Sequence, residues 1–196
     1  LAHDKYISIK GNARIYNLYE PNSLSLYLSS GRSVCAAFSY LSSIVVRKSR
    51  WEATFSNPKF IGTAYIHVQK LLEICVQGAI LLYISQPLVD ARLGNDSFRD
   101  QGLVSRVLLD INGFIMLAGV CLQPYDVNAA RSLLNLLRYE YPLCRILRYQ
   151  GILNKDPLWP STVLLLRDKI GHNPWMVKLA CLLGHIHALV LSLIHI

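Results

Sequence analysis

The sequence predicts a helix-rich α/β protein, in which a fragment of a parallel sheet is covered by helices and the C-terminal part is helical. First, residues 79–84 form an unbroken apolar run of strand length, which is typical of a strand buried on both faces. Second, apolar residues recur at helical spacing on both sides of this run. Third, hydrophobic residues make up 53% of the chain and charged residues 16%, so we expect a folded core and not disorder.

The first sixty residues carry the weakest pattern. Residues 24–28 fit either a helix or a strand, and Gly31 ends them. Residues 34–40 and 44–46 are rich in β-branched and aromatic side chains, which favours strands. A basic cluster, Arg47, Lys48 and Arg50, then precedes Trp51, and both a solvated loop and a nucleic-acid contact fit it.

The middle of the chain predicts helices around the buried strand. Val68, Leu71, Leu72 and Cys75 have helical spacing, and Gly78 ends that helix before the strand at 79–84. Beyond the strand, Pro87 is expected to open a short helix through residue 93, and a further helix is expected over residues 98–109.

Start and stop signals define the C-terminal helices. Asp126 is the expected N-cap of a helix with a buried stripe. That stripe comprises Val127, Ala130, Leu134 and Leu137. Residues 139–154 look irregular, Pro160 and Gly171 bracket another helix, and Asn173-Pro174 starts the last one. We therefore expect a partial α/β core over residues 1–122 and a helical region over residues 123–196.

The net charge and the cysteine spacing limit which classes of partner and cofactor we expect. The net charge of +8 favours an anionic partner such as nucleic acid, nucleotide or an acidic membrane face, unless missing parts of the protein carry the acidic residues. The five cysteines lack C-x-x-C spacing, so neither a disulfide framework nor a zinc site is indicated. His185 and His187 would point to different sides of a helix, so we expect no metal site.

The beginning of the chain indicates a fragment. It starts at Leu1, its first methionine is Met116, and no signal-peptide pattern follows. We expect a piece of a larger cytoplasmic protein, inactive alone.

Two polar residues stand near the predicted sheet edge, where ligands of open α/β sheets bind. Gln86 follows the strand and is suited to orient a water or a phosphate, and Arg106 to stabilise phosphate charge. A helix cap at Gln86 and a local ion pair at Arg106 are the structural alternatives.

The run Gln86-Pro87, followed by Arg99-Asp100-Gln101-Gly102-Leu103-Val104-Ser105-Arg106, resembles a signature of helicase-like prophage and plasmid proteins. That family, whose function is uncharacterised, is found fused to or beside primases. The resemblance implies a P-loop NTPase-like, RecA-like core, with Gln86 and Arg106 as catalytic residues and Arg99 and Gln101 as weaker candidates. It implies a fragment of a mobile-element DNA replication protein, which would use ATP and magnesium and form a homo-oligomer only when intact.

The chain departs from this family in three ways. It contains no G-x-x-x-x-G-K-[ST] motif. Ser39-Tyr40-Leu41-Ser42-Ser43 stands where the family has an acidic Asp-Glu-Gly-Gly element, and the Trp-Asp-Gly element is absent. No bound cofactor is therefore expected for the fragment.

Arginines and tyrosines are interleaved over residues 138–149. This combination can bind single-stranded nucleic acid, because arginine contacts phosphates and tyrosine rings stack on bases. The candidate binding residues are Arg138, Tyr141, Arg145 and Arg148. A helix end followed by a loop needs the same residue types without any ligand.

A second function class fits the C-terminal pattern. Residues 175–194 are mostly apolar and long enough to cross a bilayer, which would make the protein a non-enzymatic membrane subunit or anchor with a C-terminal transmembrane helix. His185 and His187 near the middle favour a buried core helix instead.

Overall fold

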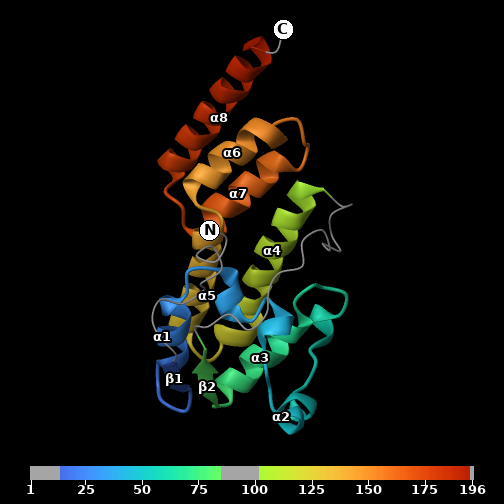
Figure 1. Ribbon diagram of the computed structural model, residues 1–196, viewed down its shortest axis with the longest axis vertical. Coiled ribbons are helices and arrows are strands. Elements are labelled where there is room, and N and C mark those ends of the chain that lie inside the picture. Colours follow the sequence, from blue (N-terminus) through green and yellow to red (C-terminus); the bar gives the residue numbers. More distant parts are fainter. Residues whose placement is uncertain (1–13, 85–101, 195–196) are drawn as a thin grey trace. The chain divides into compact units, whose positions relative to one another are not determined.

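Eight α-helices and one pair of strands make up most of the regular structure in the computed structural model, which describes residues 14–84 and 102–194, with side chains as far as residue 186 (Figure 1). The helix-rich character predicted from the sequence is confirmed. The chain divides into two units. The first comprises Leu1–Asn95 and Asn112–Glu140, and the second comprises Asp96–Ile111 and Tyr141–Ile196.

The first unit holds both strands and most of the short helices. Its elements are β1 (Arg14–Asn17), α1 (Ser23–Ser30), the 3-10 turns η2 (Val34–Ala37), η3 (Leu41–Ser43) and η4 (Pro58–Phe60), α2 (Lys48–Ala53), α3 (Ile66–Val76), β2 (Ile80–Tyr83), the end of α4 (Leu103–Leu117), the π-helix η6 (Ala118–Leu122) and α5 (Val127–Glu140).

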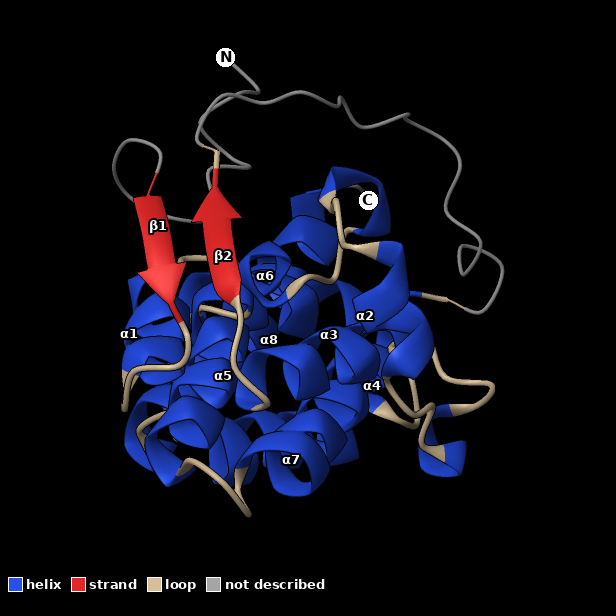
Figure 2. Ribbon diagram, turned by 90° about the horizontal axis from the view of Figure 1, so that it is seen from below, coloured by secondary structure: helices blue, strands red, loops and turns tan. Residues whose placement is uncertain are grey.

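The two strands lie side by side and run antiparallel (Figure 2). Arg14 pairs with Tyr83 and Asn17 with Ile80. Leu82 in β2 is 58% exposed and Ile15 opposite it in β1 is 72% exposed, whereas Tyr16 is buried. The strand at 79–84 therefore forms as predicted, but the expected burial on both faces is wrong, because the described sheet is covered on one side only. A parallel sheet is not confirmed.

Turns and 3-10 helices replace the strands expected near the N-terminus. Residues 34–37 form η2, with the Ser33 hydroxyl accepting a 3.3 Å hydrogen bond from the Cys35 amide, and residues 44–46 have no regular structure. β-propensity reflects packing on a sheet more than a backbone preference, and no neighbouring strand lies beside either segment among the described residues.

The core of the first unit forms where α1 and α5 pack and where α3 meets η6. Leu28 of α1, Leu72 of α3 and Leu136 of α5 are fully buried. The rings of Tyr65 and Phe114 meet edge to face at 5.3 Å. Gly113 permits this approach, because a Cβ there would lie 2.2 Å from Cδ2 of Tyr65.

The second unit contains the start of α4 together with α6 (Leu143–Leu153), α7 (Trp159–Ile170) and α8 (Pro174–Ile194). Residues 143–153 form a helix where irregular chain was expected, and that prediction is wrong. Helix α6 packs chiefly on α8. Gly184 makes this close contact possible, because a Cβ there would lie 2.7 Å from the Leu147 carbonyl oxygen and from Cβ of Gln150.

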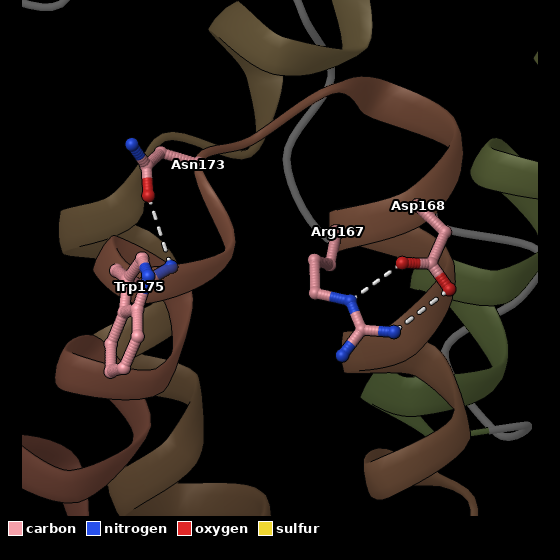
Figure 3. Close-up of polar contacts among 4 residues, drawn as sticks. All are labelled: Arg167, Asp168, Asn173 and Trp175. Atoms are coloured by element: carbon pink, nitrogen blue, oxygen red, sulfur yellow. Dashed lines mark hydrogen bonds and ion pairs between the residues drawn. The ribbon is translucent and has the colours of Figure 1, made fainter.

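The predicted caps of α5 and α8 are confirmed. Oδ1 of Asp126 accepts a 2.9 Å hydrogen bond from the Ala129 amide. Oδ1 of Asn173 accepts a 2.9 Å hydrogen bond from the Trp175 amide (Figure 3). Figure 3 also shows Arg167 and Asp168 near the end of α7, with Nε of the arginine 2.5 Å from Oδ1 of the carboxylate. This exposed pair lowers the pKa of Asp168 but contributes little stability.

Candidate functional site

An open pocket of about 270 Å³ lies in the first unit, between the segment of residues 41–51 and helix α3. Apolar side chains form most of its wall, and one cation stands among them. The lining residues are Leu41, Ile44, Val46, Lys48, Trp51 and Leu71. Such a site suits a ligand with an apolar face and an anionic or polar group.

His67 lies on α3 one helical turn before Leu71; Leu71 lines the pocket and His67 does not. Its Nε2 atom is buried and has no hydrogen-bond partner among the described residues. The backbone of Ser39 and Phe38 favours the protonated ring and so raises its pKa, against the effect of burial. In a neutral imidazole one ring nitrogen carries the proton and the other is an acceptor.

Burial lowers the pKa of His67 below its ordinary value of 6.5, against the opposing effect of the Ser39 and Phe38 backbone. The imidazole is therefore neutral at pH 7. The backbone beside it is strained, because Phe38 adopts a left-handed conformation with φ of 63°. A buried acceptor without a partner is uncommon in folded proteins and points to a ligand or a water at that atom.

One cation lines the pocket, and a second contacts a residue of its wall. Nζ of Lys48 lies 3.6 Å from Glu52 in an exposed pair on α2. Nζ of Lys70 stands 4.6 Å from the ring centroid of Trp51, which fixes that indole against α3. Arg50 donates a hydrogen bond to the Gly78 carbonyl oxygen, so its guanidinium faces the protein.

This arrangement combines three chemical capacities. His67 can accept a hydrogen bond or a proton, Lys48 can hold an anionic group, and the Trp51 ring can pack against an apolar face. No group of three or more His, Cys, Asp or Glu side chains suited to a metal ion occurs in the part of the chain that the structure describes.

The residues expected at the sheet edge do not gather in one described site. Gln86, Arg99 and Gln101 lie outside the described residues. Arg106 lies on α4 in the second unit, with Nη2 3.7 Å from Oδ1 of Asp110. The catalytic roles predicted for Gln86 and Arg106 stay predictions.

The candidate nucleic-acid residues divide between the two units. Arg138 is exposed in the last turn of α5 in the first unit. The second unit holds Tyr141, which is 4% exposed, together with Arg145 and Arg148 on α6. The Arg145 guanidinium lies 6.0 Å from the centroid of the Tyr141 ring. Nucleic-acid binding by these four residues stays a prediction.

Sequence reasoning missed His67. It stands in Tyr65-Ile66-His67-Val68, where one histidine between apolar residues carries no motif. Its partners, Phe38 and Ser39, are far away along the chain, so only the fold reveals the bare nitrogen.

Comparison with known proteins identifies a relative of a different class from the one expected. The chain is 38% identical over 118 residues to abequosyltransferase RfbV of Salmonella typhimurium, and the match covers 60% of the chain. The match covers 35% of the relative, so the chain spans about a third of that protein's length. No family model matches the chain. No solved structure matches it either.

This relative overturns the functional expectation drawn from the sequence. The match to a sugar transferase extends over 118 residues, whereas the helicase-like resemblance depended on a short run around Gln86 and Arg106. The assignments to a helicase-like, P-loop NTPase-like family and to prophage or plasmid DNA replication are wrong. The alternative of a membrane subunit or anchor gains no support from the match.

One helical stretch among the described residues, Leu103–Leu122, is long and apolar enough to cross a membrane. Of its most apolar window 44% is buried, and a core helix of a soluble protein can pass the same test of length and composition. The segment expected as a membrane helix lies in α8, where Pro174–Ile186 forms a shorter apolar helix over the residues with described side chains.

Proposed function

We propose that this chain takes part in glycosyl transfer, the movement of a sugar from an activated donor to a hydroxyl group of an acceptor. The observation that carries the proposal is the 38% identity to abequosyltransferase RfbV over 118 residues. Identity over 60% of the chain is too extensive to reflect one shared motif. The proposal specifies the transferred sugar and its acceptor only by chemical class.

The pocket beside α3 is the proposed site of this chemistry. In glycosyl transfer the acceptor oxygen attacks the anomeric carbon of the donor, and the bond from that carbon to the leaving group breaks. The leaving group departs with the electron pair, and the acceptor hydroxyl gives up its proton to a base. We assign the role of base to Nε2 of His67, a buried polar atom with no hydrogen-bond partner among the described residues, on the helix whose Leu71 lines the pocket.

The walls of the pocket suit the remaining parts of the substrates. The Trp51 ring and the aliphatic side chains offer an apolar surface to the carbon–hydrogen face of a sugar ring. Lys48 offers a positive charge to an anionic leaving group. The binding of ATP and magnesium by the intact protein, expected from the helicase-like resemblance, stays a prediction and enters no step of this proposal. The cytoplasmic location, the homo-oligomer and the parallel sheet stay predictions.

A chimera tests the proposed function. The 118 matched residues of RfbV are replaced with those of this chain, and the transfer of sugar to the RfbV acceptor and the release of the donor's leaving group are both measured. We expect measurable transfer or donor cleavage. A chimera that keeps a cooperative unfolding transition yet shows neither activity would contradict the proposal.

Substitution of His67 tests the site. The full 196-residue chain is titrated with a panel of nucleoside-diphosphate sugars, and binding is followed by ligand-observed NMR. We expect His67→Ala to weaken sugar contact, and His67→Gln, which restores an acceptor, to recover part of it. In an active chimera that contains residue 67, loss of a base at this position should lower the turnover rate by about 10²- to 10⁴-fold. The exposed His185→Gln is the matched control.

A further inference from the structure

The segment from residue 38 to residue 53 contains no buried side chain. Elsewhere in the first unit, buried residues recur within every helix of comparable length, as in α1 and α3. Helix α2 and the turn η3, both within this segment, bury none of their residues. The segment thus contributes its side chains to the surface and to the pocket beneath, not to the core.

Apolar side chains occupy this exposed position. Val45 is fully exposed and Leu41 is 58% exposed, while Tyr40 is 38% exposed. Removal of these side chains from water is favourable in proportion to the apolar area that each exposes. Three exposed apolar side chains therefore lie within six residues of the sequence, and exposed apolar groups of this kind favour an interaction partner.

Cations adjoin the apolar residues. Arg47 and Lys48 are exposed and follow Val45 and Val46 directly. Glu52 is the one carboxylate between residues 38 and 59, and it lies within 3.6 Å of Lys48 in a pair exposed to solvent. The two cations outnumber this one carboxylate, so the net charge of the segment stays positive. The exposed pair itself is weak. We name Tyr40, Leu41, Val45, Arg47 and Lys48 together the 40–48 surface.

The combination selects one kind of partner. Protein grooves commonly bind a helix or a strand, whose side chains repeat at a fixed spacing. Residues 44–46 form neither helix nor strand, so their apolar side chains have no such repeat. An anionic lipid surface makes no such demand. It accepts apolar side chains at the level of the acyl boundary and attracts adjacent cations to its headgroups.

We propose that the 40–48 surface binds the chain peripherally to an anionic lipid bilayer. Val45 and Leu41 enter the interface, Tyr40 lies at the level of the headgroups, and Arg47 and Lys48 contact the lipid phosphates. Membrane binding of this kind goes beyond the proposed sugar transfer and needs no membrane-spanning helix.

Vesicle sedimentation tests the proposal with the full chain. Vesicles of equal parts phosphatidylcholine and phosphatidylglycerol are compared with vesicles of phosphatidylcholine alone, at low and at high salt. We expect sedimentation with the anionic vesicles at low salt and a marked loss at high salt. The readout does not involve sugar, so failure here is distinguishable from failure of the proposed function.

Variants assign the binding to these residues. Leu41→Ser with Val45→Ser should lower the partition coefficient at least about tenfold. Arg47→Gln with Lys48→Gln should lower it about fivefold for each cation removed. Ile61→Ser and Arg131→Gln are the matched controls, because both residues are exposed in the same unit outside the 40–48 surface, and we expect them to bind like the unchanged chain.

Three results would overturn the proposal. The first is equal sedimentation with neutral and anionic vesicles, and the second is unchanged binding by the serine variant with a native circular dichroism spectrum. The third is absence of binding to the anionic vesicles at low salt. Single-stranded DNA binding that depends on Arg47 and Lys48 would then assign the basic cluster to nucleic acid. All four substituted positions are exposed or lie outside the core, so the variants are expected to fold.

Discussion

The Tyr141 hydroxyl donates a 2.7 Å hydrogen bond to Oδ2 of Asp110, and both residues are buried within the second unit. The tyrosine precedes α6 and the aspartate lies on α4, so the bond joins two helices that are distant along the chain. His172 adds a third element, because its Nε2 lies 2.9 Å from the Tyr141 carbonyl oxygen. The region between α4, α6 and the α7–α8 turn is therefore held by polar contacts as well as by packing.

Tyr141→Phe should destabilise the second unit by about 1.5–3 kcal/mol, because it removes a donor from a buried carboxylate. Urea unfolding measures this, followed by far-ultraviolet circular dichroism, which reports on both units. Tryptophan fluorescence in a Trp51→Phe background adds a signal from the second unit through Trp159 and Trp175. Tyr125→Phe is the control, since Tyr125 is 71% exposed and its substitution should leave stability unchanged. Equal stability of the two variants would show that the buried bond contributes nothing measurable.

Gly184→Ala should loosen the contact between α6 and α8. The added Cβ would lie 2.7 Å from the Leu147 carbonyl oxygen, and backbone cannot rotate out of the way as a flexible side chain can. We expect a loss of about 1–3 kcal/mol in the free energy of unfolding, measured by urea unfolding and circular dichroism, which reports on both units. Gly119→Ala meets nothing within 4 Å and should be neutral or stabilise by up to about 1 kcal/mol. The opposite order of the two variants would refute the close packing.

The cysteines should differ widely in their reactivity. Burial raises the pKa of the Cys75 thiol to about 12, so on the order of one molecule in ten thousand carries the thiolate at pH 8. Cys144 is exposed on α6. A short iodoacetamide pulse followed by peptide mass spectrometry should label Cys144 in the folded protein and Cys75 only in urea. Rapid labelling of Cys75 without denaturant would contradict its burial.

His67 should make the stability of the protein depend on pH. Its folded-state pKa is lowered below 6.5, so the unfolded chain binds the proton more readily than the folded chain does. Stability is therefore complete above about pH 6.5 and falls as the pH drops below that value toward the folded pKa. His67→Gln removes this contribution, so the wild type should lose stability relative to the variant on acidification from pH 7.5 to pH 5.5. Parallel unfolding curves over that range would contradict the lowered pKa.

Local chemistry made some elements predictable from the sequence. Asp126 and Asn173 act as caps because each bonds an amide two or three residues ahead, and the signal lies within one turn of chain. The helix around Val68 and Leu72 followed from apolar spacing, since these positions meet the core. Gly171 ends α7 in a left-handed conformation, as a glycine at that position allows.

Elements whose burial depends on distant partners were not predictable. Helix α6 was missed because one of its inward positions is Gln150, a polar residue that the hydrophobic pattern does not count. Its Oε1 accepts a 2.7 Å hydrogen bond from Nε1 of buried Trp159, and its amide nitrogen lies 3.0 Å from Nε2 of His185. Likewise, the environment of His67 includes residues 38 and 39, which are distant along the chain, so no local sequence pattern predicts it.

The pairing of β1 with β2 determines when that sheet can form during folding. All of α1, α2 and α3 lie between the two strands in the chain, so the ends of a long loop must meet before the first strand hydrogen bond is made. With only two strands and one covered face, the pairing stabilises the protein little, and this gain barely offsets the conformational entropy lost on closing the loop. It follows that the sheet closes late, after the helices between the strands have packed, and that it is among the first regions to exchange its amide hydrogens with solvent.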